Sequence, residues 1–354
     1  MFVHPDRLER WLGQSQVATI SDAMREFYAP IPVAGVPGHV VAYKGDFIGH
    51  IDGGAEASLE QKLWDLRMYP ENRWRVHDNI HAGFTSLSDL ISEATTGGKL
   101  QSYPFSKVGS LAVSGSFESL WGVGNIPAAG GNPGTLDGAN PTNATGGALA
   151  QNNAAGGDTL HLTSLFAQGS AAPNTMLLYD RLWHGLPNMN SNVAQAITMS
   201  LTRYATTTSP GNFAFVEVTS VLANTAHNIQ IKYTDQAGGA AEQTAARAGI
   251  AQCAATRLDH GTWYIPLNAG DNGFRTITEF LLSAAVATGA ANLVAGHPLA
   301  FVPCPVANAM TVLDCINSAF NLQQILDNAC LAFLGIKGVA TATTYNGMVN
   351  LVSG

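Results

Sequence analysis

The chain has 354 residues, of which 46% are hydrophobic and 12% charged, and its formal net charge is −8. This hydrophobic content excludes disorder as the main state, and it suffices for two compact units or for one large β-fold with extensions. Binding to phosphates requires clustered Lys and Arg, so the negative charge predicts no direct nucleic-acid partner and no anionic membrane partner.

The N-terminal segment does not have the form of an export signal. Asp6, Arg7, Glu9 and Arg10 stand where a signal peptide carries its apolar stretch, and no run of eighteen apolar residues occurs. We therefore expect a soluble, unexported protein. The cysteines form no CxxC motif and begin only at Cys253, so we expect reduced, buried thiols and neither a disulfide framework nor a zinc site.

Charged residues are concentrated at one end of the chain. Residues 1–90 carry 20 of the 42 charged side chains, although the remaining part is almost three times as long. The overall charged fraction is about half of the usual quarter. A monomer with so few charges would be poorly soluble. The low charge therefore predicts that the longer part is covered by other subunits or has a surface of Thr, Ser, Asn and Gly.

The region 1–108 is expected to be an arm with short helices and extended stretches. Apolar residues at helical spacing predict a helix near 17–27, and sequences of capping-box form predict two more near 58–66 and 86–98. The prolines and glycines of 30–38 favour an extended arm between them. Residues 109–158 follow as a loop or linker. Their section 127–158 is rich in Gly, Asn and Ala and cannot form a core, and it is either flexible or ordered by another chain.

Residues 159–354 alternate in the period of β-strands. The alternation is clear at 197–202 and 228–233, and further apolar or β-branched runs occur at 175–183, 212–219, 262–267, 274–282, 298–303 and 345–352. Segment 311–334 is compatible with helix and with strand. About eight strands without crossover helices predict a mainly β fold, an antiparallel β-sandwich or jelly roll with an α-containing N-terminal arm.

No group of residues has the pattern of a catalytic or metal site. His77 and His81 have the spacing of two metal ligands on a helix, but Asp78 replaces the expected Glu and Gly83 interrupts the helix. Glu217 and Glu279 lie in predicted strands, where an outward-facing salt bridge is expected rather than a general acid. No GxSxG or phosphate-binding loop occurs. We therefore expect no enzyme activity, no metal and no cofactor.

Tryptophan and arginine, typical of interface anchors, occur together in the charged region. The residues expected at an interface are Trp64, Arg67, Arg73, Trp74, Arg75, Trp183 and Trp263. A small local core with cation–π contacts is the equally weighted alternative.

Three phrases stand out in residues 159–354: TMLLYDRLWH (175–184), WYIPLNAGDNGFRTITEFLLSA (263–284) and GHPLAFVPCPV (296–306). They resemble a family of virion structural proteins of tailed bacteriophages, found among capsid-associated proteins. The resemblance implies a β-sandwich module that assembles on a phage head or as part of it.

The residues and the resemblance together predict a virion protein, made in the host cytoplasm, whose partners are itself and other capsid proteins. No uninterrupted pattern for a long spine helix of about twenty residues is present, which favours a head decoration or cement subunit over a capsid shell subunit. The low charge predicts a homo-oligomer, and the resemblance suggests a trimer. A glycan-binding attachment module, or a hydrolase whose residues converge from distant positions, is the alternative.

Overall fold

The computed structural model describes residues 30–32, 40–43, 84, 87–95, 98–206, 209–316 and 322–354. It divides the chain into two units, residues 1–91 and 92–354. In the first unit, β1 (Pro30–Pro32) pairs antiparallel with β2 (Val40–Tyr43), where the sequence favoured an extended arm. The helices expected near 17–27 and 58–66 lie outside the described residues.

One helix is described, α7 (Leu87–Thr95), and it agrees with the helix expected near 86–98. Leu90 is its buried residue. Gly98 follows with φ of +63°, a left-handed conformation that glycine adopts without the steric cost of a side chain.

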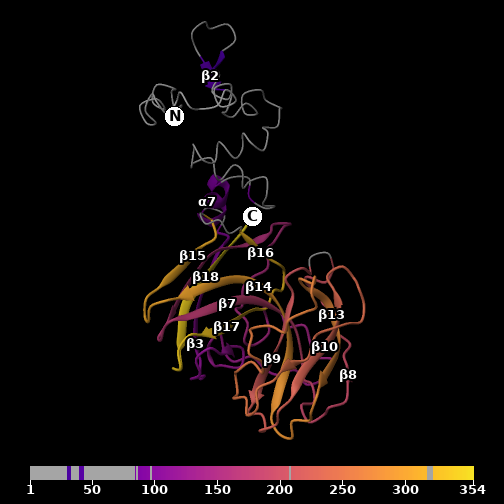
Figure 1. The fold of residues 1–354 in the computed structure, drawn as a ribbon. Helices are drawn as coiled ribbons and strands as arrows, with labels where there is room; N and C mark the ends of the chain where they lie inside the picture. Colours follow the sequence, from indigo (N-terminus) through magenta and orange to yellow (C-terminus); the bar gives the residue numbers. More distant parts are fainter. Residues whose placement is uncertain are drawn as a thin grey trace, which may run out of the picture. The chain divides into compact units, whose positions relative to one another are not determined.

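The second unit is built from three antiparallel sheets (Figure 1). Sheet 1 has the order β15-β6-β18-β3-β5, with β16 also paired to β6. Sheet 2 has the order β4-β17-β7-β14-β9. Sheet 3 has the order β11-β10-β13-β8, with β12 also paired to β10. This architecture confirms the expected mainly β, antiparallel fold.

The strands of sheet 1 are β3 (Leu100–Val108), β5 (Asn125–Ile126), β6 (Leu160–Gly169), β15 (Thr311–Asp314), β16 (Gln323–Ile325) and β18 (Thr344–Ser353). Those of sheet 2 are β4 (Phe117–Ser119), β7 (Asn174–Gly185), β9 (Phe213–Ser220), β14 (Ala290–Cys304) and β17 (Leu331–Lys337). Those of sheet 3 are β8 (Gln195–Ala196), β10 (Asn228–Asp235), β11 (Glu242–Gln243), β12 (Arg247–Ala248) and β13 (Phe274–Leu282).

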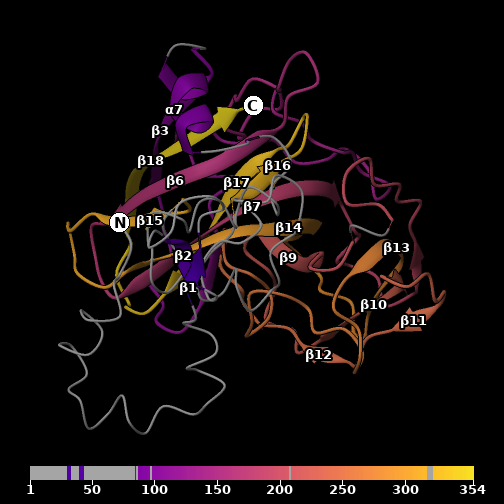
Figure 2. The same cartoon turned by 90° about the horizontal axis from the view of Figure 1, so that it is seen from above.

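Sheet 2 lies between the other two sheets, as the two views in Figures 1 and 2 agree. Its β9 side packs on sheet 3, where Ala214 and Val216 of β9 share a core with Ile231 of β10 and Phe280 of β13. Its β17 side packs on sheet 1, where the rings of Phe333 and Phe105 lie 4.5 Å apart.

The opposite face of sheet 2 is covered by loops. Because side chains alternate along a strand, Phe213 and Phe215 of β9 point away from sheet 3. They share a second core with Trp121, from the connection between β4 and β5, and with Leu258, from the connection between β12 and β13. These connections close the side of sheet 2 on which the candidate site lies.

The β-rich unit begins earlier in the chain than the expected boundary at residue 159. Strand β3 belongs to sheet 1, where it pairs with β18, so residues 100–108 are not part of an arm. The glycine-rich section 127–158 is hydrogen-bonded to other parts of its own chain. Its backbone bonds include Ala139 with His184 and Leu149 N–H with the Leu331 carbonyl.

Some segments differ locally from their expected form. Segment 311–334 forms strands β15, β16 and β17 in its described part. Residues 262–267 are not a strand. The Ile265 side chain packs in the core, and its backbone N–H donates to the Ala214 carbonyl. Residues 197–202 keep the expected alternation of burial, but only β8, just before them, pairs in a ladder.

Candidate functional site

A buried ion pair lies on the loop-covered face of sheet 2. Arg181 comes from β7 and Glu217 from β9, on either side of β14, and they are 0% and 3% exposed. The guanidinium donates Nη1 to Glu217 Oε2 at 3.1 Å and Nη2 to Oε1. Asn292 of β14, opposite Glu217 in the register, donates its amide to Oε1 at 2.9 Å. The carboxylate is thus bound from two strands.

The segment around β4 completes this group. Ser119 donates its hydroxyl to Glu217 Oε2 at 2.5 Å, and the Trp121 ring lies over the Arg181 guanidinium at 4.5 Å from its centroid. The indole N–H donates to the Gly131 carbonyl. A side chain at Gly130 would collide with the indole ring, which explains why this loop must be glycine-rich where it covers the tryptophan.

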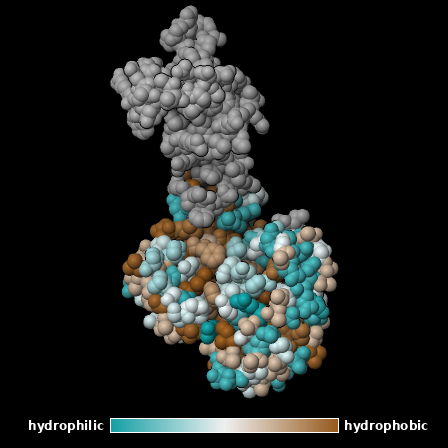
Figure 3. All heavy atoms as spheres, in the orientation of Figure 1, coloured by the Kyte–Doolittle hydropathy of each residue, from teal (hydrophilic) through white to brown (hydrophobic). Residues whose placement is uncertain are grey.

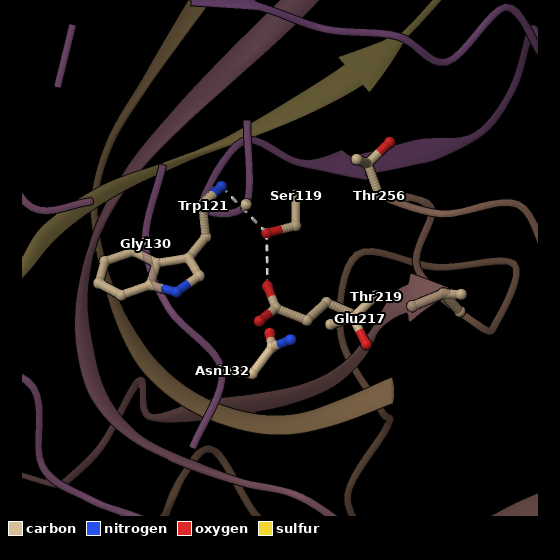
Figure 4. A pocket seen from close by; sticks show the side chains of 9 residues that line it. Ser119, Trp121, Gly130, Asn132, Glu217, Thr219 and Thr256 are labelled. Atoms are coloured by element: carbon tan, nitrogen blue, oxygen red, sulfur yellow. Dashed lines mark hydrogen bonds between the residues drawn. The ribbon is translucent and has the colours of Figure 1, made fainter. Parts of the chain in front are cut away.

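A small pocket opens beside the carboxylate (Figure 4). Its volume is about 150 Å³. Most of its lining side chains are polar, with Trp121 forming one wall; the lining residues are Ser119, Trp121, Gly122, Gly130, Asn132, Glu217, Val218, Thr219 and Thr256. Figure 4 shows the Ser119 hydroxyl directed at the Glu217 carboxylate.

The charges at this site are fixed by their neighbours. Burial alone would raise the pKa of Glu217, but the Arg181 guanidinium and the hydrogen bonds from Asn292 and Ser119 hold it below its usual value. Burial, followed by repulsion from Arg181, lowers the pKa of His184 to about 3. Neutral His184 accepts hydrogen bonds from Arg181 at Nδ1. The site therefore contains one anion, one cation and a neutral imidazole at ordinary pH.

This arrangement suits binding better than proton transfer. A carboxylate with a depressed pKa, already accepting from a guanidinium, is a weak general base. The hydroxyls and amides of the lining can exchange hydrogen bonds with a small polar group such as a sugar hydroxyl or water.

Asp180 and Arg181, in the phrase TMLLYDRLWH, show why the site could not be recognised from the sequence. Asp180 and Arg181 point to opposite faces of β7, and each makes a buried ion pair. Asp180 accepts from Arg203 Nε at 2.8 Å and from Nη2 at 2.9 Å. The expectation of an outward-facing Glu217 is wrong, because Glu217 is buried and Arg181 neutralises its charge in the protein interior. Glu279 does form the expected surface pair, with Lys232 at 2.8 Å. The only sequence signal was charged residues within otherwise apolar strands.

The residues expected at an interface are distributed differently. Trp64, Arg67, Arg73, Trp74 and Arg75 lie outside the described residues, as do His77 and His81. Trp183 is 1% exposed and donates its indole N–H to the Asp137 carbonyl, so it packs inside its own chain.

Trp263 is partly buried and belongs to a surface group of aromatic rings. Its ring centroid lies 4.7 Å from that of Tyr264 and 5.5 Å from that of Phe301, both of which are exposed. Of the expected interface tryptophans that the structure describes, this one has aromatic neighbours at the surface.

Within the described ranges, no three His, Cys, Asp or Glu side chains are grouped so that they could hold a metal ion. All four cysteines are buried and unpaired, in agreement with the expectation from the sequence. No helix in these ranges is long and apolar enough to span a bilayer.

Comparison with known proteins gives little similarity. No family model matches the chain, and no curated protein matches it. Three matching solved structures are of infectious bursal disease virus. They are the Gt strain (10% identity, 72% of this chain and 80% of the other, TM-score 0.17), the VP2 subviral particle (7%, 74% and 86%, 0.16) and derived T=1 particles (9%, 74% and 83%, 0.17).

These alignments are too weak to carry an argument about fold or mechanism. The matches are at most to structural proteins of a virus particle, and none of these three is to a tailed phage. The tailed-phage resemblance remains an expectation from the three sequence phrases.

Proposed function

We propose that this chain is a structural subunit of a virus particle, and more specifically a decoration or cement subunit on the head of a tailed phage. A shell subunit is the second role in the same class. The proposal includes no enzyme activity. Its partners are further copies of the chain, as a trimer, and other capsid proteins.

The observation that carries the proposal is exposed apolar surface beside an edge strand. Strand β15 lies at one end of sheet 1, and Val312 in it is 50% exposed. Val306 and Met310, just before it, are 59% and 51% exposed. In Figure 3, hydrophobic residues gather at the end of the β-rich unit where Figure 1 draws β15. An exposed apolar edge strand is a template for pairing with another chain.

Two further features support self-association. The aromatic group of Trp263, Tyr264 and Phe301 offers ring surface of the kind enriched at interfaces. The low charge of residues 91–354 leaves few groups to keep copies apart in solution.

Light scattering of the purified chain at micromolar concentration tests the proposal. We expect a closed oligomer that Val312→Lys dissociates, because a lysine on an edge strand opposes pairing. Val193→Lys is the matched control, since Val193 is 68% exposed and lies between β7 and β8. A wild-type chain that stays monomeric on concentration would remove the physical reason for the proposal.

The arm idea has a separate test on particles. Deletion of residues 1–57 is expected to leave a folded β-rich unit, seen by circular dichroism, that no longer joins particles in negative-stain images. Incorporation at full occupancy would show that these residues are not the assembly arm.

A glycan-binding attachment module is the second candidate, favoured by the polar pocket beside Glu217. Its hydroxyl, amide and carboxylate lining matches the hydrogen-bonding groups of a sugar. A glycan array with the wild-type chain and with Thr256→Val tests it; binding that the variant loses would support this alternative over the structural role.

A further inference from the structure

Three polar side chains share one face of three neighbouring strands at the β4 end of sheet 2. They are Glu118 of β4, Lys337 of β17 and Asn174 of β7. Lys337 stands opposite Asn174 in the register, and Glu118 stands opposite Gly335, two residues before Lys337. Directly opposite side chains start about 5 Å apart, and diagonal ones about 7–8 Å apart. The lysine is therefore flanked by an amide on one side and a carboxyl on the other.

This group is sealed from water. Glu118, Lys337 and Asn174 are 0%, 2% and 4% exposed. Sheet 1 covers it: the Tyr345 ring centroid lies 5.9 Å from Lys337 Nζ, and Phe105 packs on Phe333 nearby. A buried amine and a buried acid are each expensive as ions. Burial lowers the pKa of Lys337 and raises the pKa of Glu118, which favours a neutral amine beside a neutral acid.

The amide and the amine are separated by a single hydroxyl. Thr343 Oγ1 accepts from Lys337 Nζ at 2.6 Å and from Asn174 Nδ2 at 3.2 Å. The backbone N–H of Gly338 donates to Asn174 Oδ1 at 3.0 Å, which polarises the amide carbonyl and would stabilise negative charge on that oxygen. The carbonyl carbon of Asn174 is thus polarised, and the amine, which also donates to the Thr341 carbonyl at 2.8 Å, shares the Thr343 hydroxyl with the amide.

The two carboxyl oxygens of Glu118 differ in their hydrogen bonding. Its Oε1 accepts from the backbone N–H groups of Ser110 and Leu111 and from the Thr256 hydroxyl. Its Oε2 is buried and has no hydrogen-bond partner among the residues that the structure describes. A buried carboxyl oxygen without a hydrogen bond lowers the stability of the fold, so its presence needs a reason other than stability. A proton-accepting role is one, because Oε2 can take up the proton that Lys337 must lose to become a nucleophile.

We propose that Lys337 and Asn174 form an intramolecular amide bond between β17 and β7. Neutral Lys337 Nζ attacks Asn174 Cγ, and the C–Nδ2 bond breaks. Glu118 takes up the proton that the lysine ammonium must lose before the attack. The proton that the amine loses on attack passes through the Thr343 hydroxyl, which is bonded to both nitrogens, to the departing nitrogen, and one ammonia molecule leaves. Atoms and charge balance without an oxidant, a metal or any other reactant. The product links the last residue of β17 covalently to the first residue of β7.

Intact-mass spectrometry of the purified full chain tests this directly. We expect a mass lower than the sequence mass by one ammonia molecule, and a proteolytic fragment that joins the peptides of residues 174 and 337. Cleavage by trypsin after Lys337 should be lost. A chain at the full sequence mass, or one in which Asn174 is hydrolysed to the acid without a joined fragment, overturns the proposal.

Variants separate the chemistry from folding. Lys337→Arg and Glu118→Gln should each give a chain of full sequence mass. Lys232→Arg, at a partly exposed position of β10, should keep the loss of ammonia. If Glu118→Gln does not fold, Asn174→Asp provides an independent measurement, because an acid in this position must release water in place of ammonia. An Asn174→Asp chain that folds and keeps its full mass counts against the proposal.

Discussion

Removal of one partner from the Arg181–Glu217 pair should be among the most damaging single changes to the β-rich unit. Glu217→Ala leaves a guanidinium that is 0% exposed without its anion, and it takes an acceptor from Ser119 and Asn292. Breaking a buried pair in this way costs about 3–5 kcal/mol. At about 2–4 °C per kcal/mol, the melting temperature should fall by about 6–20 °C.

Urea denaturation at neutral pH, followed by circular dichroism, measures this loss. Glu279→Ala is the control, because the Lys232–Glu279 pair is partly exposed and should contribute less than about 1 kcal/mol. The double variant Arg181→Met, Glu217→Leu should be more stable than Glu217→Ala alone, since it leaves no unpaired charge. If Glu217→Ala costs no more than Glu279→Ala, the carboxylate is not buried against the guanidinium as described.

Three further predictions concern a buried histidine, a packed glycine and the cysteines. His227 bonds Asp259 at 2.8 Å and the Thr225 carbonyl at 2.9 Å, so both ring nitrogens donate and its pKa is raised, chiefly by Asp259. Its contribution to the free energy of unfolding should be complete below about pH 6.5 and be lost as pH rises through the raised pKa, by up to about 1.4 kcal/mol per pH unit; urea titrations in which His227→Gln shows the same pH dependence would contradict this. Gly335→Ala places a methyl group 2.9 Å from the Tyr345 hydroxyl and should cost about 1–3 kcal/mol in the same assay. Gly131→Ala, with open space around it, should cost less, and equal costs would refute the tight contact. Chelator or reductant should leave the thermal melt unchanged, because the cysteines are unpaired; a large drop in chelator would direct attention to His77 and His81.

Periodicity predicted the strands whose two faces differ in polarity. Strand β10 was predicted because Ile229, Ile231 and Tyr233 alternate with polar residues; these three face the core between sheets 2 and 3. Strand β3, the first of the β-rich unit, was missed because its residues 100–108 alternate weakly and contain Pro104 and Lys107. Lys107 is buried, with Nζ donating to the carbonyls of Val123 and Pro127. Burial of a lysine whose partners are backbone carbonyls cannot be predicted from the sequence, because every residue has a carbonyl.

The candidate site could not be predicted because its parts are far apart in the chain. Ser119, Arg181, Glu217 and Asn292 come from four strands or their ends, and each has its own unremarkable surroundings in the sequence. Their convergence depends on the order β7-β14-β9 within sheet 2 and on the glycine-rich loop that covers it. A single sequence gives strand content by pattern, but strand order follows from long-range packing.

The position of β18 has a consequence for synthesis of the protein. This strand lies between β3 and β6, with Val352 paired to Leu100 and Ser353 to Leu160. Sheet 1 therefore cannot close until the ribosome has passed residue 353, and until then β3 and β6 present unpaired edges to other nascent chains. Contacts across such a large sequence separation also slow folding. Chaperones should thus stay bound to the ribosome-bound nascent chain until this strand emerges. Only subunits that include β18 would then be available for assembly.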